Sequence, residues 1–174
     1  MSRDRDMVAF SIDGQEVEAR PGTLLLPVAR ALGFEIPSLC HEDGVGPYAS
    51  CRLCLVEADE GRRTRIVTAC DYPVRDGLAI RTSTPRVDAL RRSVIRLHLA
   101  RAPRSPEIRA IAARLGVASP EGLRENDRDE RCILCGLCAR VCAEVVGAHA
   151  IGMAGRGGRK RITLPFDEEG GREC

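Results

Sequence analysis

Nine cysteines in a chain of 174 residues offer the clearest possibility for chemistry. Four of them fall within eleven positions: Cys132, Cys135, Cys138 and Cys142. Three thiolates at C-x2-C-x2-C spacing can surround one face of a cubane, and this run is typical of a [4Fe–4S] cluster, with Gly136 allowing close approach. A zinc knuckle is the alternative metal site. We therefore predict Cys132, Cys135 and Cys138 as cluster ligands.

A second set of cysteines lies earlier, with the spacing C-x10-C-x2-C-x15-C: Cys40, Cys51, Cys54 and Cys70. One close pair and two distant single cysteines suit a [2Fe–2S] cluster, which takes four thiolates. Gly44 and Gly46 in the first loop would let backbone N–H groups approach sulfur. A zinc ribbon more often shows two CxxC knuckles. The spacing favours iron–sulfur chemistry over zinc or purely structural thiols.

Composition and charge agree with a metal-binding interpretation of the cysteines. The net charge of +2, from 27 basic and 25 acidic residues, argues against a nucleic-acid binder. No apolar signal region follows the N-terminal charges, and no run approaches the ~20 apolar residues of a membrane span. We therefore expect a cytoplasmic protein without membrane spans. Disulfides are rare in that compartment.

The residues up to 83 predict a small α+β domain. Alternating apolar residues around Asp13-Gly14 predict a hairpin over 7–20. Thr23 is expected to cap a short helix that ends near Gly33, although Pro27 limits the length of this helix or places its start later. Paired strands are expected over 54–60 and 63–70, with a further strand over 78–83.

The next residues predict two helices. Thr84 as N-cap and Pro85 at the first position open one helix. Its buried face is expected at Val87, Leu90, Val94 and Leu97, with Arg91, Arg92 and Arg96 largely away from that stripe. A second helix begins at Ser105-Pro106 and stops at Gly116. Residues 117–131 are expected to be a linker, and the Gly-rich, charged stretch from 155 to lie on the surface.

A family resemblance is carried by the segment LCHEDGVGPYASCRLCLVEAD, residues 39–59. It resembles the N-terminal [2Fe–2S] domain shared by the complex I large iron–sulfur subunit, the small diaphorase subunit of NAD-reducing hydrogenases, NAD-dependent formate dehydrogenases and iron-only hydrogenases. The CRxCxVE core is its specific part. Ala49-Ser50 stands where the family often has glycine. CAEVVG, residues 142–147, resembles the CxEVxG of the hydrogenase and complex I group.

The resemblance implies a division of the α+β chain into three parts. A β-grasp-type [2Fe–2S] ferredoxin domain is expected at 1–83, a helical connector at 84–130 and a [4Fe–4S] ferredoxin-like domain at 131–174. In many family members the connector binds a further cluster through a histidine and three cysteines. His98 stands at the position of that histidine, but no cysteine lies between Cys70 and Cys132. We interpret His98 as a surface or helix-packing residue and not as a ligand.

The fourth ligand of the [4Fe–4S] cluster stays open between Cys142 and Cys174. In two-cluster ferredoxins the fourth cysteine of the run serves the other cluster, and a proline normally follows it, whereas Ala143 follows Cys142 here. In the two-cluster relatives a segment like PFDEEGGREC leads into a second cysteine motif, so the chain would be truncated or split at Cys174. Alternatively, Cys174 is a remote fourth ligand, or Cys142 closes the site and Cys174 is idle.

Two different clusters on one chain predict an electron relay. The resemblance implies an electron-transfer subunit of an NAD(P)-linked oxidoreductase, of the hydrogenase, formate dehydrogenase or NADH dehydrogenase kind. The implied partners are a flavoprotein subunit that binds FMN and NAD, and a catalytic subunit. No catalytic residue is predicted, because the chain has three histidines and no plausible Ser-His-Asp set, and GRGG at 155–158 lacks a nucleotide-binding context. The alternatives are an independent soluble ferredoxin and a non-redox metal-binding or sensor protein.

Overall fold

The computed structural model describes residues 7–124 and 131–164. The chain divides into two compact units, which are described separately. The first unit comprises Met1–Leu39 and Cys51–Ile133, and the second comprises Cys40–Ser50 and Leu134–Cys174. Within the described ranges no helix has the length and apolar character needed to cross a membrane.

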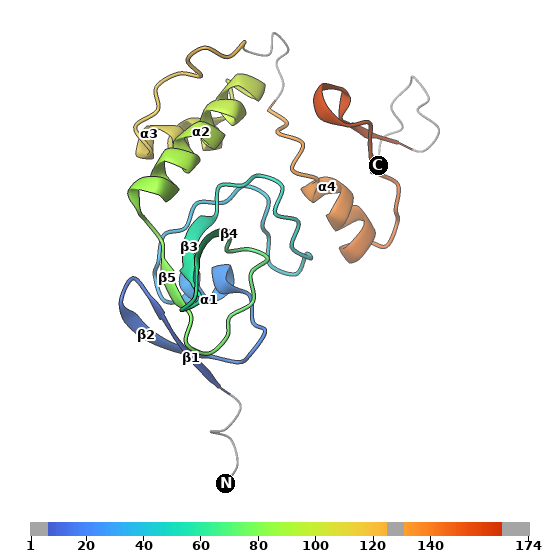
Figure 1. Cartoon of the computed structure of the whole chain (residues 1–174). Helices are drawn as coiled ribbons and strands as arrows, with labels where there is room; N and C mark the ends of the chain where they lie inside the picture. The colour runs from blue at the N-terminus through green and yellow to red at the C-terminus, as the bar shows by residue number, and fades with distance from the viewer. Residues whose placement is uncertain (1–6, 125–130, 165–174) are drawn as a thin grey trace. The chain divides into compact units, whose positions relative to one another are not determined.

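The first unit is built on a five-stranded mixed sheet with the order β2-β1-β5-β3-β4 (Figure 1). Only β1 and β5 pair in parallel, and the other neighbours are antiparallel. The strands are β1 Val8–Ile12, β2 Gln15–Ala19, β3 Leu55–Asp59, β4 Thr64–Thr68 and β5 Ala79–Arg81. All the strands expected in this part of the chain are present.

The β1–β2 hairpin forms where the sequence predicts it. Asp13 and Gly14 both have positive φ, 50° and 85°, which is the backbone of a type I′ turn. Phe10 and Ile12 of β1 and Ile80 of β5 are at most 2% exposed. The alternation along β1 thus places its apolar residues in the core of the unit.

The helix α1, Leu25–Ala31, begins one residue later than a cap at Thr23 would place it, in agreement with the later start that Pro27 allows. Thr23 does not cap it: Leu24 is in the N-cap position and makes no side-chain cap bond. The reason is tertiary, because the Thr23 carbonyl accepts from Val74 N–H at 2.8 Å and keeps the chain extended. The N–H groups of Leu25 and Leu26 donate to carbonyls of the segment 69–72, which replaces a side-chain cap.

The helices α2, Pro85–Arg101, and α3, Pro106–Arg114, lie side by side (Figure 1). Thr84 Oγ1 accepts from Val87 N–H at 3.2 Å, so the predicted cap of α2 is confirmed. Ser105 Oγ likewise accepts from Ile108 N–H, at 3.4 Å.

The predicted buried stripe of α2 is confirmed at its first residue, Val87, and is wrong after it. Leu90 and Leu97 are 38% and 57% exposed, whereas Arg91, Ile95 and Leu99 are buried. Arg91 and Ile95 each follow a predicted position, Leu90 and Val94, by one residue, or about 100° around the helix. Arg91 occupies the buried face because its guanidinium donates to the Leu55 carbonyl at 2.6 Å, which satisfies part of its polar character there.

The second unit contains a short helix and a two-stranded hairpin. The helix α4, Leu137–Arg140, continues into a π-helical turn η1, Val141–Val145. The antiparallel strands β6, Gly152–Ala154, and β7, Arg161–Thr163, flank the 3-10 turn η2, Gly157–Arg159. The sequence did not predict this hairpin, because glycine and charge dominate its composition and its strands are only three residues long.

Candidate iron–sulfur centres

The first unit holds three of the four predicted [2Fe–2S] ligands around the β3–β4 hairpin. Cys54 directly precedes β3, and Cys70 follows β4 by two residues. Because Leu55 pairs with Thr68, the two cysteines lie at the same end of the hairpin, and Ala69 N–H donates to the Cys54 carbonyl at 2.9 Å. Cys51, Cys54 and Cys70 are each at most 1% exposed.

The backbone before β3 is shaped around the Cys51 sulfur. Leu39 N–H donates to Cys51 Sγ at 3.4 Å, which is the kind of contact that tunes iron–sulfur sites. Arg52, between the two cysteines of the CxxC, has a φ of 54°, in the left-handed region that a residue with a side chain rarely adopts. Cys40 directly follows Leu39 in the chain and is 1% exposed.

The helix α2 contacts the backbone of the segment 51–55 through two side chains seven residues apart. His98 Nε2 lies 2.8 Å from the Cys51 carbonyl oxygen. Since a carbonyl only accepts, Nε2 carries the hydrogen and donates. The second side chain is Arg91, which donates to the carbonyl of Leu55. Besides packing on the helix, His98 therefore hydrogen-bonds through Nε2 to the backbone of the predicted ligand Cys51.

Arg91 is a buried cation with incomplete compensation. It is 4% exposed, and its Nη1 is 3.9 Å from a carboxylate oxygen of Asp88. Its Nε has no hydrogen-bond acceptor among the residues that the structure describes. Burial lowers the pKa of Arg91, and the negative charges of Asp88, Cys54 and Asp13 oppose that shift. Sequence reasoning missed the burial of Arg91, because this residue lies outside the apolar stripe that the sequence predicts for the helix.

The predicted [4Fe–4S] ligands are divided between the two units. Cys135, Cys138 and Cys142 belong to the second unit, and Cys132 belongs to the first. Cys142 is buried, Cys135 is half-buried, and Cys132 and Cys138 are exposed. Ala150 N–H donates to Cys142 Sγ at 3.2 Å. Cys174 lies outside the described residues.

Close packing in the second unit explains one glycine of the cysteine run. Gly136 has a φ of 74° and forms the N-cap of α4. A Cβ there would lie 3.0 Å from Met153 Sδ and 3.2 Å from the Tyr48 ring. Glycine therefore suits both the backbone and the close packing at this position.

The segment 40–50 is fastened to α4 and η1 within the second unit. Glu144 Oε2 accepts from Gly46 N–H at 2.6 Å, and Arg140 Nη2 donates to the Cys40 carbonyl at 2.6 Å. Arg140 also donates to the Gly46 carbonyl and lies over the Tyr48 ring, 5.3 Å from its centroid. Sequence reasoning missed these contacts, because Glu144 and Arg140 lie 98 and 100 positions from their partners in the chain.

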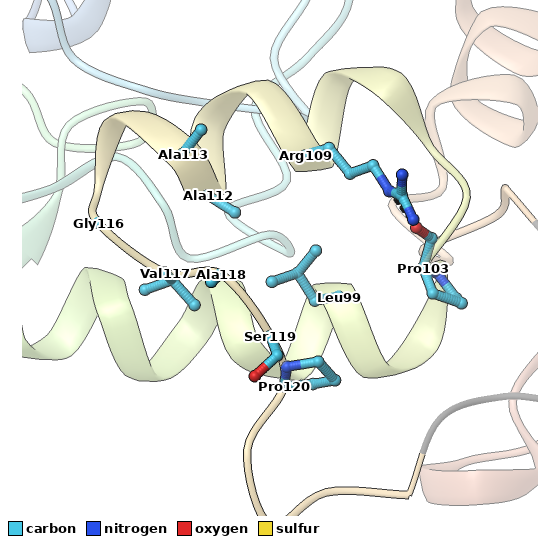
Figure 2. A pocket seen from close by; sticks show the side chains of 10 residues that line it. All are labelled: Leu99, Pro103, Arg109, Ala112, Ala113, Gly116, Val117, Ala118, Ser119 and Pro120. Atoms are coloured by element: carbon cyan, nitrogen blue, oxygen red, sulfur yellow. Dashed lines mark hydrogen bonds between the residues drawn. The ribbon is translucent and has the colours of Figure 1, made fainter.

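A cavity of about 550 Å³ lies between α2, α3 and the segment that follows α3 (Figure 2). Leu99 and Ala112 reach it from the two helices, and Val117 and Pro120 from the segment. Arg109 Nε, at one end, donates to the Pro103 carbonyl at 2.7 Å. None of the predicted ligands lines this cavity. In the described ranges no three His, Cys, Asp or Glu side chains form a group that could hold a single metal ion.

Comparison with known proteins identifies the N-terminal part of the chain. Residues 5–85 match the family described as 2Fe-2S iron-sulfur cluster binding domain. The first part of the chain is a mixed α/β, [2Fe–2S] ferredoxin-like domain. The predicted fold class is confirmed to that extent. The β-grasp assignment and the C-terminal [4Fe–4S] domain stay predictions.

Longer oxidoreductase subunits are similar over most of the chain. An NADH-quinone oxidoreductase subunit of Rhizobium meliloti is 33% identical over 182 residues, covering 90% of this chain and 21% of the relative. The alpha subunit of the NADPH-Fe(3+) oxidoreductase of Geobacter sulfurreducens is 31% identical over 174 residues, covering 87% of this chain and 20% of the relative. The chain thus spans about a fifth of the length of these curated relatives.

A solved structure is similar as well. One chain in the crystal structure of an NAD+-reducing [NiFe]-hydrogenase in the H2-reduced state matches with a TM-score of 0.79 and 28% identity. The match covers 91% of this chain and 75% of that chain. The predicted resemblance to iron–sulfur subunits of NAD(P)-linked oxidoreductases, including NAD-reducing hydrogenases, is therefore confirmed. The resemblance to formate dehydrogenases stays a prediction.

Proposed function

We propose that this chain is an electron-transfer subunit of an NAD(P)-linked oxidoreductase complex. It would relay single electrons through a [2Fe–2S] and a [4Fe–4S] cluster. The observation that carries the proposal is the match of residues 5–85 to a [2Fe–2S] domain, in which Cys51, Cys54 and Cys70 are buried. The names of the relatives, which are NADH- or NADPH-linked oxidoreductases, support the redox context.

The proposed ligands of the [2Fe–2S] cluster are Cys40, Cys51, Cys54 and Cys70. Such a cluster distributes four thiolates over two irons, so its ligands need not converge on one point. Two observations fit the group: the predicted ligands are almost fully buried, and the Leu39 N–H donates to a ligand sulfur. When bound, the cluster would accept and release one electron at a time. The chain's own part is to exclude water and to fix the ligand backbone through α2.

The proposed [4Fe–4S] ligands are Cys132, Cys135 and Cys138, with Cys142 or Cys174 as the fourth. This part of the proposal is supported by the C-x2-C-x2-C spacing. The burial of Cys142 and the N–H donated to its sulfur favour Cys142 as the local fourth ligand.

The proposed organisation is a [2Fe–2S] domain at 1–83, a connector at 84–130 and a [4Fe–4S] domain at 131–174. The proposed partners are a flavoprotein subunit, which would split electron pairs from a nicotinamide into single electrons, and a catalytic oxidoreductase subunit. The proposal of partners is supported by the relatives and the solved neighbour, which are named as subunits or as part of a hydrogenase.

Metal analysis and electron paramagnetic resonance (EPR) of the anaerobically purified chain test the proposal. Iron and sulfide with two reducible paramagnets are expected. Zinc in place of iron would refute it and favour a non-redox metal protein. Cys54→Ser is expected to remove the [2Fe–2S] signal and spare the other, and Cys138→Ser is the reciprocal control.

The fourth [4Fe–4S] ligand is decided by comparing Cys142→Ser with Cys174→Ser under the same conditions. Loss of the [4Fe–4S] signal in Cys142→Ser alone is the expected result. Loss in Cys174→Ser alone would refute the local assignment. Co-purification of the tagged chain with a flavoprotein tests the partner proposal, and a chain that purifies alone from its native source would favour an independent ferredoxin.

A further inference from the structure

A buried arginine, Arg91, packs against the backbone that follows the CxxC segment of the first unit. Arg91 projects from α2 and donates to the Leu55 carbonyl at 2.6 Å, one residue beyond Cys54. Cys54 is fully buried, and Arg91 is 4% exposed. A cation and a predicted thiolate ligand are thus enclosed in the same interior, where water screens their interaction weakly.

We propose that Arg91 raises the reduction potential of the [2Fe–2S] cluster by holding a fixed positive charge behind Cys54. This inference rests on the proposed function. Reduction of an iron–sulfur cluster by one electron adds one unit of negative charge, with no bond formed or broken. A nearby positive charge therefore stabilises the reduced form more than the oxidised form. Net charge and the hydrogen-bond environment are established determinants of such potentials.

Arg91 suits this role because its charge is permanent and poorly neutralised. Guanidinium stays protonated in proteins, so no proton moves when the electron arrives. Its only described carboxylate neighbour within ion-pair distance, Asp88, is 3.9 Å away, and the Asp88 side chain is 31% exposed. Asp88 also accepts from Ser83 Oγ at 2.8 Å, which diverts part of its charge from the arginine.

The neighbouring residue provides a matched control. Arg92 is exposed on the same helix, so Arg92→Gln removes the same charge from a solvated position. Arg91→Gln is expected to make the [2Fe–2S] midpoint potential more negative, and Arg91→Lys to stay closer to the wild type. The shift in Arg91→Gln is expected to persist at 0.5 M salt, whereas any shift in Arg92→Gln is expected to vanish because exposed charges are screened.

Asp88→Asn supplies a test of opposite sign. It removes the carboxylate that partly neutralises Arg91, so the potential is expected to become less negative. Asp88→Asn also decides the question if Arg91→Gln does not fold, because the side chain of Asp88 is partly exposed and asparagine has nearly the same shape.

The midpoint potential of the [2Fe–2S] cluster is measured on the full chain by potentiometric titration followed by EPR. A wild-type chain without iron and sulfide would refute the proposed function, and this inference with it. A wild-type cluster whose potential is unchanged in both Arg91→Gln and Asp88→Asn would refute this inference alone. An equal, salt-sensitive shift in Arg91→Gln and Arg92→Gln would also refute it, because it would show a general surface-charge effect.

Discussion

Replacing His98 with leucine is expected to loosen the backbone of the segment 51–54. His98 Nε2–H donates to the Cys51 carbonyl at 2.8 Å, and His98 is half-buried while Cys51 is 1% exposed. Leucine fills a similar volume but cannot donate. The loss of one donor to a buried carbonyl costs about 1 to 2 kcal/mol, the lower part of the usual range because water can reach the half-buried histidine site.

That cost translates into a measurable opening of the segment. About 1 to 2 kcal/mol changes an equilibrium between closed and open backbone by a factor of roughly 5 to 30. Where opening is fast compared with the observed reaction, the observed rate follows the open population. Amide hydrogen exchange in the segment 51–54, and transfer of iron to a chelator, are both expected to accelerate by about this factor.

Two companion variants give the assay its specificity. His98→Gln retains an N–H donor and is expected to lie between the wild type and His98→Leu. Leu97→Gln changes the adjacent residue, which is 57% exposed, and is expected to behave as the wild type. Exchange and iron release in His98→Leu at the wild-type rate would refute the reasoning, because the contact would then contribute nothing to the segment.

Three further predictions concern a cap, a carboxylate and a glycine. Thr84→Ala removes the N-cap of α2 and is expected to cost about 1 kcal/mol in urea unfolding, with Thr84→Ser close to the wild type. The hydrogen bond from Tyr72 leads the causes that lower the pKa of Glu60. The ionised Glu60 carboxylate therefore stabilises the folded state at pH values above its unfolded pKa. This stabilisation is lost as the pH falls through the lowered pKa of the folded state. Glu60→Gln is expected to flatten the acid side of the thermal stability curve, and an unchanged curve would contradict this. Gly136→Ala is expected to weaken the [4Fe–4S] signal more than Gly147→Ala, because both have positive φ but only Gly136 has close packing neighbours; equal effects would exclude a packing role.

Locally determined features were predictable from the sequence. The Asp13-Gly14 turn and the caps at Thr84 and Ser105 each depend on residues within three positions of one another. The CRxCxVE motif, which includes Cys54, identified the [2Fe–2S] domain. The spacing of its cysteines can be recognised in the sequence without knowing the fold.

Features set by distant contacts were not predictable. The start of α1 depends on the hydrogen bond from Val74 N–H to the Thr23 carbonyl, and these residues are 51 positions apart in the chain. The buried face of α2 depends on whether Arg91 finds an acceptor, and that acceptor, Leu55, belongs to another element. An analysis of hydrophobic periodicity assigns arginine to the exposed face of a helix. It therefore predicted burial at Leu90 and Val94 in place of Arg91 and Ile95.

The helix α2 contacts the backbone of the predicted ligands although it contains no cysteine. No thiol lies between Cys70 and Cys132, so α2 supplies no thiolate to a cluster. Its buried face nevertheless directs one donor, His98, to the carbonyl of Cys51 and another, Arg91, to the carbonyl just beyond Cys54. Ile95, fully buried between them, fixes the helix against the same unit. A helix that orders the ligand backbone and places a charge behind it can set when the proposed cluster is reduced without ligating it.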